Sequence, residues 1–385
     1  MKKSLAALAV LGAFAGSAFA ADVTLYGLVD YGFNYTHYDA DYTGVDDDSS
    51  FQMKSGQNSG SRFGLRGSED LGNGLKVGFV LENGFDADTG ALGFQSRLFG
   101  RESQAYLEGS FGKVSFGRMG QLASANGTYG LLGAFSPFST GWGNTVGPKH
   151  VMANGCDRFD NMISYQSPNF AGFTVYAQYS FKNNVNNAGD ENKSNTDRYY
   201  GIGATYKTGN LALLGVVDSI NYANASLGSE GHSDDDMLTV TLGGTYDFEV
   251  VKLYAIGQYF DNAYKVGAQS AYSNPAFDAL KVDYSSGYYF NGGMEGYGMA
   301  LGVSAPAFGG TAKAQAGYMD AECIDDADYS VSRFNFSVGY DYNLSKRTSL
   351  YTAANFTKDD YKHKTEAYNA KPQTYEIMAG MIHRF

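Results

Sequence analysis

Apolar and polar positions alternate with a period of two along most of the chain. Between residues 23 and 35, apolar or aromatic residues such as Phe33 occupy most odd positions, and polar residues such as Asp30 lie at even ones. Because successive side chains of a β-strand point to opposite faces, this pattern predicts a strand with one apolar and one polar face. The alternation returns in residues 62–70 and 75–85, and no helical period is sustained.

The expected strands are joined in turn by short turns and by long polar loops. Short turns rich in Gly, Asn, Ser and Asp are expected at residues 71–74, 109–113, 167–172, 207–210, 247–250, 305–310 and 343–347. Longer loops are expected at residues 36–60, 86–100, 181–197, 220–235, 261–292, 320–331 and 358–372. Counting the hairpins predicts an up-and-down meander of about sixteen strands.

The last strand is expected to pair with the first. An open sheet edge in hydrocarbon would leave unpaired backbone N–H and C=O groups, each costing several kcal/mol. Residues 375–385 alternate again, with Tyr375 and Ile377 on the apolar face. The predicted fold class is all-β, an antiparallel transmembrane β-barrel of about 16 strands, with short periplasmic turns and long extracellular loops.

Composition agrees with a barrel in a membrane. The chain has 50 Gly, 31 Tyr and 26 Phe but one Trp and six Pro, which favours twisted strands and aromatic belts over a helical core. The mean hydropathy of −0.30 is compatible with this, because only every second strand residue of a barrel faces lipid.

The first residues predict export. Lys2 and Lys3 precede a short apolar run, and Ala18 and Ala20 provide the small residues of a cleavage site. Residues 1–20 are therefore predicted to be a signal peptide, and residues 21–385 a single barrel domain.

The charge balance argues against nucleic-acid binding. Without its first two lysines the chain has 26 basic and 40 acidic residues, a net charge of −14, whereas nucleic-acid binding needs a basic stripe. Acidic runs at residues 46–48, 234–236 and 325–328 lie in expected loops. Solvated surface charge is the simpler interpretation of these runs, and divalent cations bridging to lipopolysaccharide are the alternative.

Several segments resemble the Gram-negative general porins, especially the trimeric family of Neisseria and Bordetella. The likeness rests on VTLYGLVDYG, SRFGLRGSEDLGNGLKVGFVLENGF, FGKVSFGR, DNMISYQSPNFAGF and the terminal HRF. The resemblance implies a sixteen-stranded homotrimeric barrel for passive diffusion of small hydrophilic solutes and ions, with no cofactor. It also implies that Phe385 is a signal for the barrel-assembly machinery, and that the barrel lies among lipopolysaccharide and outer-membrane lipid.

The resemblance further implies that the third long loop folds into the lumen and narrows it. This constriction loop corresponds to residues 120–156, too long a segment for a simple connection and rich in apolar side chains, including Trp142. Such a composition favours packing against the inner wall, and the alternative is a mobile surface loop.

The same resemblance places Arg62, Arg101 and Arg158 in a basic cluster at the constriction. Arg62 lies in the polar register of its strand, but Arg101 shares the parity of Leu107 and needs a bulge to turn inward. Further candidates for the constriction are Arg66, Arg118 and Lys149. No Asp or Glu occurs between Gly120 and Cys156, so we expect a preference for anions.

Other functions are less well supported. The five histidines lie apart, and neither a His-x-x-x-His nor a Cys-x-x-Cys spacing occurs, which leaves an outer-membrane enzyme without catalytic or metal-binding residues. A substrate-specific channel, with tyrosines as a slide for sugars or with selective binding of organic anions, is the stronger alternative. Cys156 and Cys323 form either one disulfide or two free thiols.

Overall fold

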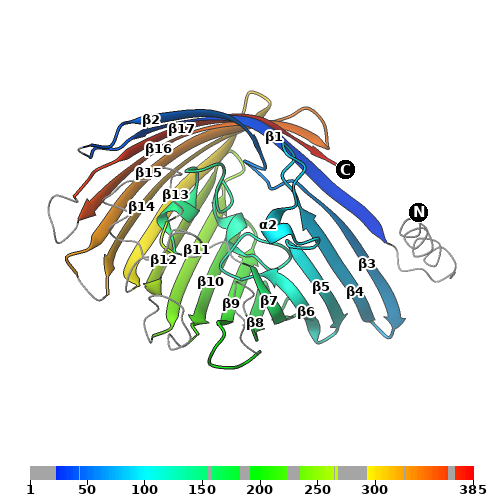
Figure 1. Ribbon diagram of the computed structural model, residues 1–385. Coiled ribbons are helices and arrows are strands. Elements are labelled where there is room, and N and C mark those ends of the chain that lie inside the picture. The colour runs from blue at the N-terminus through cyan, green and yellow to red at the C-terminus, as the bar shows by residue number, and fades with distance from the viewer. Residues whose placement is uncertain are drawn as a thin grey trace, which may run out of the picture.

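A computed structural model shows a closed β-barrel (Figure 1). It describes residues 23–42, 44–153, 158–182, 191–223, 235–263, 265–267, 293–324, 327–362 and 369–385. The predicted signal peptide and Cys156 lie outside these described residues. No helix among them has the length and apolar character needed to span a membrane.

The strands run antiparallel in chain order around the barrel. They are β1 (Thr24–Asp39), β2 (Asp48–Ser55), β3 (Arg62–Gly72), β4 (Leu75–Gly84), β5 (Glu102–Gly109), β6 (Gly112–Gly120), β7 (Arg158–Gln166), β8 (Phe173–Ser180), β9 (Arg198–Thr208), β10 (Leu211–Asn221), β11 (Met237–Asp247), β12 (Lys252–Ala263), β13 (Met294–Ala307), β14 (Gly310–Cys323), β15 (Ser330–Asn343), β16 (Thr348–Lys362) and β17 (Gln373–Arg384). Among the described residues, the loops contain three short helical segments: α2 (Gly93–Ser96), η1 (Leu132–Phe135) and η2 (Pro148–Val151).

The 17 strands fill 16 positions around the barrel, because β2 and β3 share one. β2 pairs with residues Tyr31–Tyr38 of β1, and β3 pairs with residues Thr24–Leu28 of the same strand. Asp30 supports the excursion between them, since its side chain accepts hydrogen bonds from Asn58 N at 2.9 Å and Ser59 N at 2.7 Å. The predicted count of sixteen is confirmed.

The barrel closes where the two ends of the chain meet. β1 pairs with β17 from Leu28 opposite Arg384 to Asp39 opposite Gln373. Backbone hydrogen bonds of 3.0 Å also join Gly27 and Phe385 in both directions. No sheet edge is therefore left open to hydrocarbon, as the cost of unpaired backbone groups requires.

The two faces of the sheet differ as the alternation predicted. On β1, Leu25 is 61% exposed on the outside, whereas Asp30 is completely buried on the lumen side. The same division runs through the other strands, except that inward apolar residues such as Leu214, Ile256 and Met319 are buried in one cluster with residues of the segment between β6 and β7. Each predicted short turn lies between two paired strands.

Five of the seven predicted loops include strand residues, only two or three of them at the ends of β10 and β12 but more at the other three. Residues 36–60 contain the end of β1 and all of β2, β14 continues to Cys323 before β15 begins at Ser330, and β16 continues to Lys362. These strand ends carry many polar residues that resemble loop sequence, but backbone pairing continues through them. Phe51 is the residue that could have indicated strand β2, because its ring faces outward and stacks on that of Phe33, with the ring centroids 5.7 Å apart.

Candidate functional site

The long segment between β6 and β7, here called loop 3, lies inside the barrel (Figure 1). Its described part is residues 121–153. It begins against β9 and β10, where Leu122 N donates to Tyr199 Oη at 3.3 Å and Gln121 Nε2 donates to Asp218 Oδ2 at 3.2 Å. The predicted inward packing is therefore observed in the described residues, and the loop is not a mobile surface loop.

A buried tyrosine stabilises the first part of loop 3. The hydroxyls of Tyr129 and Ser115 on β6 hydrogen-bond at 2.5 Å. Burial raises the pKa of Tyr129 to about 12, so the phenol keeps its proton at physiological pH. Further along, Ser136 Oγ donates to Gln315 Oε1 on β14 at 2.6 Å, so the loop crosses several strands of the inner wall.

The apex of loop 3 is held by one carboxylate. Glu376 on β17 is completely buried and accepts hydrogen bonds from Asn144 N at 2.8 Å, Thr145 N at 2.7 Å and Thr145 Oγ1 at 2.6 Å. Beside it, the Trp142 ring packs edge-on against Tyr351 on β16, with ring centroids 5.7 Å apart. Because the carboxylate gathers several donors from two adjacent residues, it fixes the direction of the apex.

The returning half of loop 3 is tied to β15 and β12. Arg333 on β15 donates to His150 O at 3.1 Å and forms a two-point contact with Asp359 on β16, at 2.5 and 2.8 Å. Ala153 N then donates to Gln258 Oε1 on β12 at 2.8 Å. Loop 3 thus contacts the inner wall from β9 to β17, and its Thr128 and Tyr129 also contact β5 and β6.

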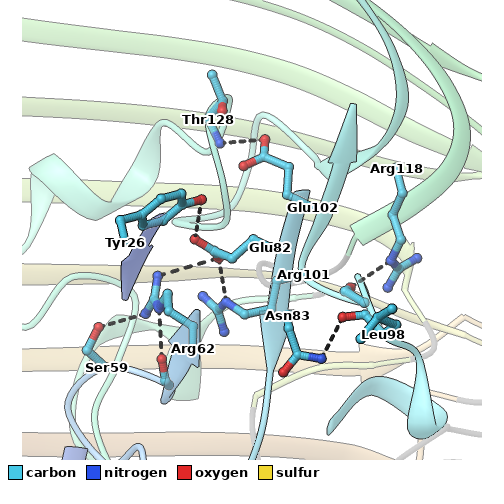
Figure 2. A network of polar contacts seen from close by, with 12 residues as sticks. Tyr26, Ser59, Arg62, Glu82, Asn83, Leu98, Arg101, Glu102, Arg118 and Thr128 are labelled. Carbon is cyan, nitrogen blue, oxygen red and sulfur yellow. Dashed lines mark hydrogen bonds and ion pairs between the residues drawn. The ribbon is translucent and has the colours of Figure 1, made fainter. Parts of the chain in front are cut away.

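The wall formed by β3 to β7 carries a cluster of arginines. Figure 2 shows Arg62 on β3 and Arg101 before β5 both directed at Glu82 on β4. Arg101 Nε lies 2.6 Å from Glu82 Oε1, and Arg62 Nη1 lies 3.8 Å from the same oxygen. Tyr26 on β1 also donates to Glu82, at 3.1 Å. One carboxylate therefore holds two guanidinium groups on the lumen side.

Arg101 faces inward despite its outward parity. It lies just before β5 begins, and its backbone N donates to Glu82 O at 3.1 Å. Since regular β5 pairing with β4 starts at Glu102, the strand register does not impose an outward direction on Arg101.

Arg118 turns inward through a β-bulge. The register between β6 and β7 shifts after Gly117, whose φ of 129° is a conformation that L side chains rarely adopt. Arg118 Nη1 then reaches Asp160 Oδ1 on β7 at 2.7 Å, and Arg97 Nη1 lies 3.0 Å from the other oxygen of that carboxylate. Asp160 and Arg97 were not among the predicted site residues.

The fifth arginine, Arg158 on β7, lies against an aromatic ring. Its Cζ is 4.8 Å from the ring centroid of Phe94, and Arg101 Cζ is 5.8 Å from the same centroid. Phe94 belongs to α2 in the loop between β4 and β5, which also folds into the barrel (Figure 1). We call Arg62, Arg97, Arg101, Arg118 and Arg158 the arginine wall.

Arg66 and Lys149 lie apart from the arginine wall. Arg66 continues the inward register of β3 towards the short turns, with its Cζ 5.2 Å from the ring centroid of Tyr26. Lys149 belongs to loop 3, where Nζ donates to Gly143 O at 3.4 Å. Lys54 on β2 lies near it and donates to Asn144 Oδ1 at 2.6 Å.

Positive charge exceeds negative charge at the arginine wall. Counted over the described residues, its five guanidinium groups are accompanied by the carboxylates of Glu82, Asp160 and Glu102, which leaves a local excess of two positive charges. The sequence could indicate Glu82 as a lumen residue, because its even position places it on the polar face of β4. No local sequence pattern indicated Asp160 or Phe94, because their roles depend on contacts between distant segments.

A closed barrel with an apolar exterior, a charged lumen and loops folded inward defines the class of β-barrel pores of the outer membrane. Residues 7–362 match the family model described as Gram-negative porin. The chain is 34% identical over 408 residues to an outer membrane porin protein of Bordetella pertussis, covering 100% of both chains. It is 27% identical over 404 residues to the major outer membrane protein P.IB of Neisseria sicca, again covering 100% of both.

Solved structures agree with this assignment. An anion-selective porin from Comamonas acidovorans superposes with a TM-score of 0.67 at 28% identity, covering 95% of this chain and 100% of the other. The trimer form of OmpT from Vibrio cholerae has the same fold, with a TM-score of 0.60 at 13% identity over 94% of this chain and 99% of the other. The chain belongs to the Gram-negative porin family, and it is an outer-membrane channel for passive diffusion.

Proposed function

We propose that this porin prefers anions and that the arginine wall is the origin of the preference. The observation that carries the proposal is the excess of guanidinium groups on β3 to β7, together with a loop 3 that has no Asp or Glu between Gly120 and Cys156. An ion that sheds water near fixed charges is selected by their sign. The selectivity named for the Comamonas porin supports the same conclusion.

The constriction consists, in this proposal, of Arg62, Arg101 and Arg158 on one side and loop 3 on the other. Arg118 contributes to the same wall. Arg66 and Lys149 lie outside the narrowest zone, Arg66 towards the short turns and Lys149 on loop 3. General diffusion, rather than a substrate-specific site, is expected. In liposome swelling with sugars of graded size, uptake should fall with size and show no saturation.

Replacing two arginines of the wall tests the charge assignment. In planar bilayers with a KCl gradient, we expect the wild type to show a reversal potential that indicates anion preference. Arg101→Gln combined with Arg158→Gln should abolish most of that preference, because it removes two positive charges and leaves Glu82 and Asp160. Arg347→Gln is the matched control, since Arg347 lies exposed in the turn between β15 and β16. Cation preference of the wild type would overturn the proposal.

The oligomeric state, export and assembly of the protein are proposed to follow the same family. We propose a homotrimer of mature chains 21–385, made after removal of residues 1–20 and folded by the barrel-assembly machinery through Phe385, among lipopolysaccharide and outer-membrane lipid. Cross-linking of native membranes should yield a species of three chains. The protein is proposed to act as a channel only, without enzymatic activity.

A further inference from the structure

The loop between β4 and β5 places one aromatic ring beside two like charges. The Phe94 ring centroid lies 4.8 Å from Arg158 Cζ and 5.8 Å from Arg101 Cζ. Both distances are within the range in which a guanidinium is attracted by the negative face of an aromatic ring. The two arginines come from different parts of the chain, Arg101 from just before β5 and Arg158 from β7, and the one ring contacts both.

Two glycines make room for this ring. A Cβ at Gly84 on β4 would lie 2.5 Å from Phe94 Cε2, and a Cβ at Gly100 would lie 2.4 Å from Phe94 Cβ. Contacts that short are incompatible with any larger residue unless the phenylalanine moves. Phe94 therefore packs closely between Gly84 on β4 and Gly100 in its own loop.

The backbone that presents the ring has an unusual conformation. Phe94 has φ and ψ of 54° and 53°, Gln95 has 60° and 42°, and Ser96 has a φ of 60°. L-residues seldom adopt the left-handed conformation in succession, because Cβ approaches the following carbonyl oxygen. Strained backbone of this kind concentrates at functional sites, where surrounding contacts hold it in place.

The ring supplies something that a carboxylate would not. Arg101 already has Glu82, but Arg158 makes no ion pair within the described part of the chain, and its buried Nε has no hydrogen-bond partner there. A carboxylate at this place would position Arg158 but cancel its charge. An aromatic face attracts both guanidinium groups against their mutual repulsion and leaves both charges available to a passing ion.

We propose that Phe94 is a specificity-determining residue, which holds Arg101 and Arg158 at the lumen without neutralising them. This inference rests on the proposed anion preference. It assigns a selectivity role to the loop between β4 and β5, in addition to that of loop 3.

Selectivity measurements on ring variants test the inference. In planar bilayers with a KCl gradient, Phe94→Leu should lower the ratio of chloride to potassium permeability about two- to fivefold, the range expected when a cation–π contact is lost. Phe94→Trp keeps an aromatic face and should retain most of the wild-type ratio. Phe85→Leu is the control in the same loop, because the Phe85 ring contacts that of Phe63, at 6.2 Å.

A trifluorinated phenylalanine at position 94 separates electrostatics from packing and covers the case in which Phe94→Leu does not fold. It keeps the shape of the ring but weakens its negative face, so the permeability ratio should fall while heat resistance of the barrel stays unchanged. If the fluorinated protein keeps the wild-type permeability ratio while the double variant Arg101→Gln and Arg158→Gln loses anion preference, the role of Phe94 is overturned and the proposed anion preference stands. A wild type without anion preference would overturn both proposals.

Discussion

At the scale of single residues, Glu82 is the member of the site whose role is easiest to misjudge. As a carboxylate in the polar register of β4, it reduces the positive charge of the lumen. The structure shows that it also fixes the position of that charge, since it accepts from Arg101 at 2.6 Å and from Tyr26 at 3.1 Å. Its effect on selectivity is therefore a balance: it cancels one positive charge of the arginine wall, and it holds the remaining guanidinium groups in position.

We predict that Glu82→Gln increases anion preference. Gln keeps an oxygen that accepts from Arg101, while one negative charge disappears. A unit charge about 4 Å away is worth about 1 kcal/mol in water, so the chloride to potassium permeability ratio should rise by up to about fivefold. Reversal potentials measure this, with Glu249→Gln in the turn after β11 as the control. A fall in anion preference would mean that positioning outweighs charge.

At the scale of elements, glycines on the inner wall decide where loop 3 can lie. A Cβ at Gly298 on β13 would be 1.5 Å from Val151 O, and one at Gly339 on β15 would be 2.6 Å from Phe138 Cε1. The backbone of loop 3 thus approaches the wall more closely than any side chain would permit. The charged contacts of Glu376 and Arg333 then hold the loop in that position.

We predict that Gly298→Ala displaces the returning half of loop 3. The added methyl group collides with backbone rather than with a flexible side chain, and overpacking of this kind costs about 1–3 kcal/mol. Single-channel conductance should change and become noisier, and loop 3 should become susceptible to proteolysis. Gly257→Ala is the matched control, because its Cβ would meet only Gly298 O, at 3.7 Å. Wild-type conductance in Gly298→Ala would contradict the close seating of Val151.

At the scale of the whole molecule, the sign of the net charge differs from that of the site. The full sequence has a formal charge of −12, yet the arginine wall carries an excess of positive charge. Both can coexist because exposed charges are screened over about 8 Å at physiological ionic strength. Exposed acidic residues farther away than this length therefore contribute little to the field at the arginine wall.

We predict that anion preference weakens as salt concentration rises. The screening length falls from about 10 Å at about 0.1 M to about 3 Å at about 1 M salt, so charges that do not touch the passing ion lose their influence. Reversal potentials at a fixed concentration ratio should decrease across that range. A preference that does not change with salt would indicate that anions contact the arginines directly.

The sequence by itself determined the barrel. Alternation with a period of two, the placement of turns and the need to close the sheet in hydrocarbon are local or general constraints, and they lead to sixteen strands with a polar lumen. The inward register of Arg62 followed from the same alternation. These features required no knowledge of which distant segments meet.

The tertiary structure alone decided how the lumen is organised. Arg101 and Arg118 face inward because of a strand start and a β-bulge that interrupt the alternation. Phe94, Asp160 and Glu376 acquire their roles only when loops and strands far apart in the chain are brought together. The physical reason is that a strand pattern specifies which face a residue occupies, whereas an ion pair or a ring contact depends on the position of a second segment that the local pattern does not encode.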